Sequence, residues 1–222
     1  MLLKFQTSSR LLEEKGMKII KRSAGYVIGL LLCFSALFAC APFSYLNINY
    51  RLPIRTDELK GKKVFLAFED ARRVKEIIGA GARKEFENFS GDISLSLARG
   101  TDPEFKIGIF EVPSLFKEAF RSRLENLGVE VISKGARGGV GLVIVLKEFY
   151  LDLQSRKWKV RMGYEASLIK ESSVLAKQMI SGQGERVKLL GRGQADTVIG
   201  EIFTDLVNRL DVPRLFQQAD LL

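Results

Sequence analysis

The feature that most constrains this sequence is a stretch without any charged residue, from residue 23 to residue 50. Its first part, residues 24–41, reads AGYVIGLLLCFSALFACA, and Lys18, Lys21 and Arg22 stand just before it. A basic segment that leads into an apolar segment is typical of an export signal. A helix spans a bilayer with about 17 to 25 apolar residues. A cleaved secretory signal, a permanent transmembrane helix and a lipoprotein signal are therefore the alternatives.

The end of the apolar stretch favours the lipoprotein signal. Leu37, Phe38, Ala39 and Cys40 resemble the bacterial lipobox, with Leu three residues before the cysteine and a small residue directly before it. Phe38 is bulkier than is usual at its position. The resemblance implies that the Cys40 sulfur receives a diacylglyceryl group, that the chain is cut between Ala39 and Cys40, and that the new amine is acylated. Two or more acyl chains hold a protein stably on a membrane, whereas one binds only marginally.

These signals divide the chain into segments. Met17 stands directly before the basic cluster, so we predict that translation begins there and that residues 1–16 are a non-native extension. Residues 17–39 are then the signal peptide, and residues 40–61 the lipidated cysteine with a polar, proline-containing tether. We expect a folded domain over residues 62–212 and a C-terminal tail over 213–222. Ala41 follows the cysteine, where bacterial lipoproteins that stay in the inner membrane have Asp. By this resemblance we expect the protein on the periplasmic face of the outer membrane. The inner membrane is the alternative.

The charge and the rare residues exclude several functions. Of 35 basic and 26 acidic residues, six and two lie in the first forty, so the rest carries a net charge of +5. This excess is mild and not clustered, which argues against a nucleic-acid partner. The chain has no histidine, and Cys33 and Cys40 are its only cysteines. The domain is therefore predicted to contain no disulfide, metal site or cofactor, and to lack the usual general base.

Two segments after residue 62 have the pattern of amphipathic helices. In residues 113–127 the apolar residues recur at spacings of three and four, and Gly128 supplies a stop. Residues 194–210 show the same periodicity with their charges off the apolar stripe, and Pro213 lies just beyond as a natural stop.

Other segments have strand patterns. Short strands are expected at residues 63–68, 92–98 and 129–132, and residues 70–92 read as a loop-rich excursion. Three long antiparallel strands in a meander are expected at residues 141–153, 158–170 and 174–187. Residues 140–146 are apolar on both faces, which places them centrally in the sheet. We therefore predict an α+β fold: an antiparallel sheet of about five strands, including the C-terminal meander, with two helices packed on one face.

The candidate site residues lie on the meander. Lys157, Lys159 and Arg161 alternate with buried residues, so they are expected to share a water-facing basic surface that can bind a partner. Glu148 and Asp152 share a strand face and are the carboxylate pair that a hydrolase would need. A solvated polar face explains the pair more simply. The glycine-rich residues 135–141 lack the ending of a phosphate-binding loop and read as a turn.

No nucleophile elbow, zinc-protease motif or dinucleotide fingerprint occurs, so we predict that the chain is not an enzyme. The lipobox, the segment SLFKEAFRSRLENLGVEV (114–131), the strand pair VIVLKEFYLDLQSRKWKVRMGYEASL (143–168) and the closing helix (194–210) together resemble the YajG-like family of small bacterial lipoproteins. A wider resemblance is to auxiliary lipoproteins of envelope ABC transport systems that move lipids. Members of the YajG-like family are largely of unknown function, whereas the wider resemblance implies a domain that binds partners and does no chemistry. Neither resemblance implies catalytic residues.

We therefore expect a non-catalytic envelope lipoprotein that binds an envelope protein or a lipid. The alternatives are an auxiliary component of an ABC-type lipid transport system and a periplasm-facing domain on an uncleaved N-terminal transmembrane helix.

Overall fold

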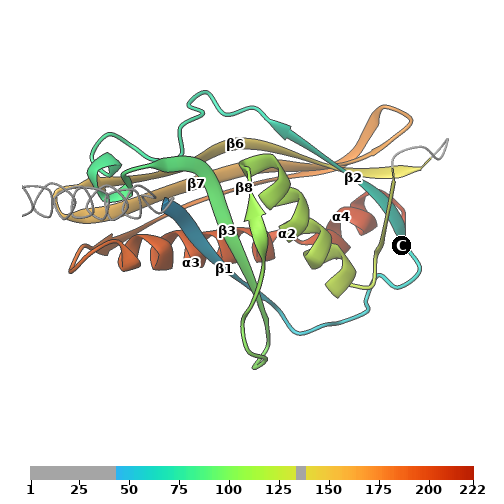
Figure 1. Cartoon of the computed structure of the whole chain (residues 1–222). Helices are drawn as coiled ribbons and strands as arrows, with labels where there is room; N and C mark the ends of the chain where they lie inside the picture. Colours follow the sequence, from blue (N-terminus) through green and yellow to red (C-terminus); the bar gives the residue numbers. More distant parts are fainter. Residues whose placement is uncertain (1–43, 134–138) are drawn as a thin grey trace, which may run out of the picture. The chain divides into compact units, whose positions relative to one another are not determined.

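The computed structural model describes residues 44–133 and 139–222. These residues form eight strands, three α-helices and one short 3-10 helix (Figure 1). The strands are β1 (Ser44–Leu52), β2 (Lys63–Asp70), β3 (Phe89–Arg99), β4 (Phe105–Phe110), β5 (Glu130–Ile132), β6 (Val140–Gln154), β7 (Lys157–Lys170) and β8 (Ser173–Val187). The helices are η1 (Arg83–Phe86), α2 (Val112–Asn126), α3 (Gly193–Arg209) and α4 (Val212–Gln218).

The larger sheet has the strand order β5-β2-β6-β7-β8. The predicted α+β class is confirmed, but the prediction of an antiparallel sheet is wrong, because β2 pairs in parallel with both β5 and β6. The reason is the long connection after β2, which includes α2. A connection of this kind returns the chain to the end of the sheet where β2 began, and the next strand then runs parallel to β2.

The predicted meander is confirmed, since β6, β7 and β8 pair antiparallel in sequence order. Its two turns are short. Ser155 and Arg156 have φ of 50° and 61°, and Glu171 and Ser172 have φ of 49° and 69°. Positive φ at both central residues is the geometry of the type I′ turn, whose twist matches that of the strands. As predicted, β6 is the central strand of its sheet.

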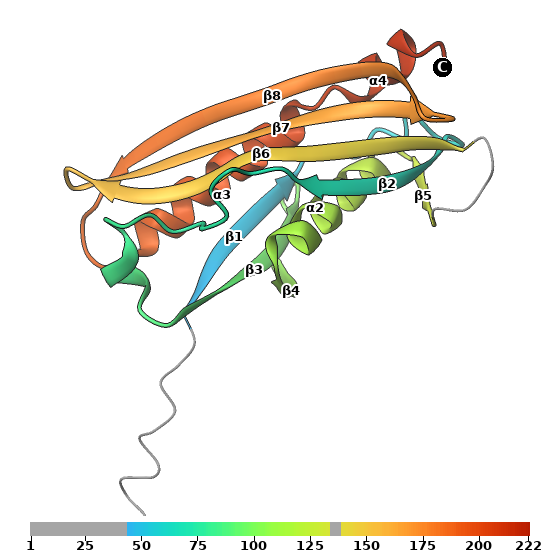
Figure 2. The same ribbon diagram turned by 90° about the horizontal axis from the view of Figure 1, so that it is seen from above.

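Both predicted helices are confirmed as α2 and α3, and they lie on the same face of the larger sheet (Figure 2). Tyr164 of β7 demonstrates this, because its ring packs edge-on against Phe120 of α2 and its hydroxyl donates to the Leu206 carbonyl of α3, 2.7 Å away. The core lies between this face and the helices. It includes a cluster of rings in which Phe116 of α2 contacts Phe149 of β6 and Phe203 of α3.

A second sheet, of order β1-β3-β4, packs on the other side of α2. It corrects the prediction of a tether over residues 40–61, because β1 occupies residues 44–52 and pairs in parallel with β3. Leu46, Ile48 and Tyr50 of β1 are completely buried. The folded unit therefore does not begin near residue 62, and residues from 44 onward belong to one compact unit. The strand signal was the alternation of apolar and polar residues in SYLNINYRL.

One flank of α3 covers the open edge of β1, and we call this contact the α3–β1 seam. Gly200 lies at its centre and lets the helix approach the main chain of Asn49. Helix side chains on either side satisfy main-chain groups of alternate β1 residues, which protects an otherwise unpaired strand edge. The bonds are Asn47 N–H to Asp196 Oδ1 (3.0 Å), Thr204 Oγ1 to the Asn49 carbonyl (3.2 Å), Arg51 N–H to Thr204 Oγ1 (3.2 Å) and Asn208 Nδ2 to the Arg51 carbonyl (2.8 Å).

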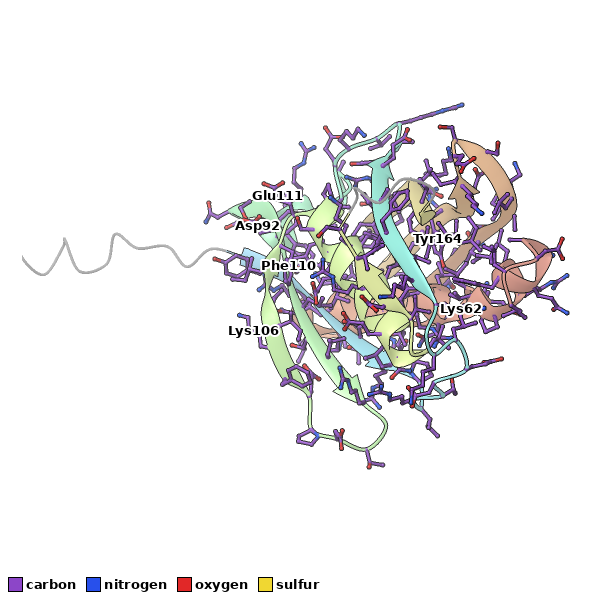
Figure 3. All side chains as sticks on the ribbon, turned by 90° about the vertical axis from the view of Figure 1, so that its right-hand side faces the viewer. Lys62, Asp92, Lys106, Phe110, Glu111 and Tyr164 are labelled. Atoms are coloured by element: carbon purple, nitrogen blue, oxygen red, sulfur yellow. The ribbon has the colours of Figure 1, made fainter. Side chains whose placement is uncertain are left out.

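The predicted C-terminal tail over residues 213–222 is also corrected. Pro213 does not end a helix but lies in the first turn of α4, where proline is well tolerated because the main-chain N–H has no partner there. Leu215 and Phe216 are buried in the core. Lys62 donates to the Leu221 carbonyl, 2.7 Å away, on the side of the unit opposite β4 (Figure 3).

Several predictions fall on residues that the structure does not describe. These are the start at Met17, the signal peptide, the cleavage after Ala39 and the lipid on Cys40. Residues 135–138 of the glycine-rich segment also lie outside the described residues, while Gly141 stands within β6. All of these stay predictions.

Candidate functional site

A groove of about 460 Å³ lies on the face of the larger sheet that points away from the helices. The turn at Ser155 and Arg156 sets the register of β6 and β7, so Asp152 stands opposite Lys159 and Tyr150 opposite Arg161. Side chains alternate along a strand, so alternate residues of β6, β7 and β8 near the β6–β7 turn point into this groove. We call it the sheet-face groove; its lining residues include Tyr150, Asp152, Gln154, Lys159, Arg161, Gln183 and Glu185.

The predicted basic surface borders this groove but is not uniformly basic. Lys157 bonds to Glu185 with a separation of 2.5 Å, and Arg161 Nε lies 2.8 Å from the Glu148 carboxylate. The hydrogen bond from Lys157 lowers the pKa of Glu185. Lys159 lines the groove between the two pairs, opposite Glu185 on β8. Acidic neighbours from other strands therefore turn a predicted cationic face into one of mixed charge.

Tyr150 and Arg161 form the main aromatic contact of the groove. The guanidinium carbon of Arg161 lies 5.3 Å from the centre of the Tyr150 ring. Burial and the nearby Asp152 carboxylate raise the pKa of Tyr150, so its hydroxyl stays protonated near neutral pH. The pair presents a planar cation stacked on a ring, an arrangement that contributes about 0.5–1 kcal/mol at exposed sites.

Glu148 and Asp152, the carboxylates of the hydrolase alternative, engage different partners. Asp152 is 7% exposed and accepts hydrogen bonds from the main-chain N–H of Ala82 and of Leu153 and from the side-chain amide of Gln154, at 3.2, 2.9 and 3.0 Å. Its carboxylate thus fastens residues 79–82 to the end of β6. Glu148 instead pairs with Arg161. This arrangement gives Asp152 a structural role at the end of β6, while Glu148 forms an exposed ion pair with β7.

Sequence reasoning missed the glycines that pack against the β6 residues of the groove. Gly79 and Gly81 press against β6 so closely that an added Cβ would meet the Tyr150 hydroxyl at 2.2 Å and the Leu153 carbonyl at 2.0 Å. The Gly79 N–H donates to the Leu151 carbonyl, 2.8 Å away. Glycines 79 and 81, separated by a single alanine, were the available signal, since such residues mark a close approach of two main chains.

Asp70, at the end of β2, belongs to a structural ion pair. Its carboxylate accepts from Nε and Nη2 of Arg72, each 2.9 Å away, and Lys75 lies 3.2 Å from it. The Arg72 side chain is 5% exposed. The hydrogen bonds from Arg72 lower the pKa of Asp70 to about 2.

We expect Asp70→Asn to lower the free energy of unfolding by about 2 kcal/mol at pH 7, because it leaves the buried Arg72 without its counter-charge. Asp70 has a lowered pKa when folded, so its contribution is present above pH 4 and is lost as the pH falls toward 2. Urea denaturation at pH 7, 4 and 3 should show that the free energies of unfolding of the wild type and of Asp70→Asn converge as the pH falls. Asp102→Asn, on an exposed loop, is the control. Equal stability of wild type and Asp70→Asn at pH 7 would contradict this assignment.

The described residues contain no group of three acidic, histidine or cysteine side chains that could hold a metal ion. Within 44–133 and 139–222, no helix is both long and apolar enough to cross a bilayer.

No family model matches the chain, and no curated protein matches it. Among solved structures, a protein from Xanthomonas campestris described by the family model DUF330 matches 82% of this chain and 100% of its own, with 12% identity and a TM-score of 0.54. This chain has the fold of that protein. PelC from Paraburkholderia phytofirmans, solved as a dodecamer (13% identity, 73% and 94% covered), has a TM-score of 0.26. A homolog of the neuraminyllactose-binding hemagglutinin from Helicobacter pylori (11% identity, 83% and 99% covered) has a TM-score of 0.31. The last two scores are too low to define a common fold.

Proposed function

We propose that this chain is a membrane-anchored binding protein of the bacterial envelope, that it catalyses no reaction, and that a protein partner docks on the sheet-face groove. The observation that carries the proposal is the set of charged side chains paired across three neighbouring strands, beside the outer edge of β8. In the described part of the chain no strand pairs with this edge.

The exposed pairs of the groove are suited to exchange with a partner. The side chains of Lys157, Glu185, Arg161 and Glu148 are 44–54% exposed. Ion pairs at this exposure contribute little to folding, because water screens their charges. A partner with its own charges can therefore replace them at small loss, and the Tyr150–Arg161 stack offers the residue types that are enriched at protein interfaces.

The edge of β8 adds main-chain recognition to the groove. Arg209 donates to the Ser181 carbonyl of this edge, and no strand of the described residues pairs with its other main-chain groups. Such an edge can accept an extended segment as an additional strand, while the neighbouring side chains of β7 and β8 select its sequence. This combination favours a protein partner over a small molecule as the ligand of the groove.

The anchor in this proposal is the lipid on Cys40, with the domain at the periplasmic face of the outer membrane. The inner membrane and an uncleaved N-terminal helix are the alternative anchors. The resemblance to auxiliary lipoproteins of ABC systems makes a lipid-transport assembly the first class of partner to test. The engagement of Asp152 in three hydrogen bonds weighs against a hydrolase.

A photo-crosslinking amino acid at Gln183, which is exposed in the groove, tests the partner site in living cells. We expect a specific protein adduct from this position and none from Lys117, an exposed residue of α2. The double variant Lys159→Glu with Arg161→Glu should reduce the adduct at least tenfold, whereas Lys117→Glu should not. Equal labelling from both positions, or a groove adduct unaffected by charge reversal, would reject the groove as the partner site.

A further inference from the structure

The first strand restricts where a membrane anchor can lie relative to the fold. β1 begins at Ser44, and the Arg192 side chain bonds to the Ser44 hydroxyl. Ser44 lies only four positions after Cys40. An extended chain covers at most about 3.6 Å per residue, so four residues reach no farther than about 14 Å. If the anchor is instead an uncleaved helix ending at residue 41, the distance from its end to Ser44 is limited in the same way. Either anchor therefore holds the end of the unit where β1 begins close to the bilayer.

Three chain segments meet at that end of the folded unit: η1, the β6–β7 turn and the loop between β8 and α3 (Figures 1 and 2). The loop is fastened to both others, because the Lys188 N–H donates to the Arg156 carbonyl and the Lys188 side chain pairs with Glu85. The Arg192 guanidinium lies over the Phe86 ring, 5.4 Å from its centre. These contacts make one continuous surface, which we call the β1-end surface.

The β1-end surface exposes apolar side chains next to cations. Leu189 and Leu190 are 70% and 90% exposed in the loop before α3. Arg83 and Lys84 of η1 and Arg156 of the β6–β7 turn are exposed on the segments to which this loop is fastened, and none of the three has an ion-pair partner within 44–133 and 139–222. Lys157 and Lys188, by contrast, are paired with carboxylates. Free cations around protruding leucines are the composition of a surface that lies in the headgroup layer of an anionic membrane.

We propose that the β1-end surface docks on an anionic lipid bilayer, with Leu189 and Leu190 inserted at the headgroup boundary and Arg83, Lys84 and Arg156 on lipid phosphates. This inference rests on the membrane anchor of the proposed function, and it adds an orientation. The sheet-face groove lies at this same end, because its lining residues on β6 and β7 flank the β6–β7 turn. The docked domain thus holds its partner site next to the bilayer surface, while the β7–β8 turn at the other end of β7 points away from it.

An environment-sensitive fluorophore tests the orientation in the full mature protein. The label is attached at Leu190→Cys, or at Ser172→Cys in the β7–β8 turn at the far end of β7, with the protein in vesicles of phosphatidylethanolamine and phosphatidylglycerol. We expect a blue-shifted emission that spin-labelled lipids quench at position 190 and a solvent-like emission at position 172. Each cation near an anionic surface contributes about fivefold to binding, so Arg83→Gln, Lys84→Gln and Arg156→Gln together should reduce the inserted fraction at least tenfold.

The mass of the mature N-terminus is measured on the same sample and reports the anchor separately. A mass that shows an uncleaved N-terminus, or a cleaved one without lipid, rejects the lipid anchor whatever the label reports. A lipidated protein whose label at 190 stays in water overturns the docking proposal and leaves the anchor intact. A label at 190 that becomes buried only when an envelope protein is added overturns it as well, because the surface is then a protein interface.

Discussion

Replacing Phe116 with alanine should lower the free energy of unfolding by about 3–5 kcal/mol, the range measured for large-to-small changes of buried aromatic residues. Phe116 is completely buried. Its ring centre lies 5.5 Å from Phe68 of β2, 5.3 Å from Phe149 of β6 and 5.2 Å from Phe203 of α3. One ring therefore joins the larger sheet to both helices, and its removal leaves a cavity that rigid neighbours cannot fill.

Urea denaturation of the purified protein measures this loss. Phe105→Ala is the matched control, because Phe105 lies on β4 with 48% of its surface exposed and should change the free energy of unfolding by less than about 1 kcal/mol. A Phe116→Ala protein within 1 kcal/mol of the wild type would show that this ring cluster does not hold the layers together.

Two substitutions at Gly200, in the α3–β1 seam, should differ strongly in their effect on the free energy of unfolding. A Cβ at this position would lie 3.4 Å from the Asn49 N atom, a tight contact that small shifts can relieve. Alanine also favours the helix over glycine by about 1 kcal/mol, so Gly200→Ala should stay within about 1 kcal/mol of the wild type. Gly200→Leu should destabilise by about 3 kcal/mol or more, since overpacking and the loss of seam hydrogen bonds add together.

Denaturation measures both variants, and hydrogen exchange locates the damage. In Gly200→Leu the amides of Asn47 and Arg51, which donate to α3, should lose protection before those of β7. If leucine is tolerated as well as alanine, α3 does not approach β1 as closely as described.

The meander and the two long helices were predictable because their signals are local. A strand buried on one face needs apolar residues at every second position, and a helix needs them every three or four, whatever the rest of the chain does. β1 carried the same alternation, yet the prolines and polar residues around it favoured a tether. Its burial depends on β3 and α3, and the partners Asn47 and Asp196 are 149 residues apart in the sequence.

The candidate site was predicted only in part. Alternation correctly placed Lys157, Lys159 and Arg161 on one face, but their charge environment depends on strands that the alternation does not reveal. Glu185, the partner of Lys157, lies 28 residues away on β8. The glycines that press against Tyr150 and Leu153 belong to a segment with no periodicity, so only the folded chain shows that they pack against β6 beside the groove.

The sequence by itself determined the α+β class, the two helices and the meander, since each depends on residues near one another in the chain. The export signal and the lipid on Cys40 stay predictions from the sequence. Only the tertiary structure decided that β2 runs parallel to its neighbours, that α3 covers the edge of β1, and that carboxylates neutralise most of the predicted basic face. These features depend on which distant segments meet, and short-range periodicity carries no information about that choice.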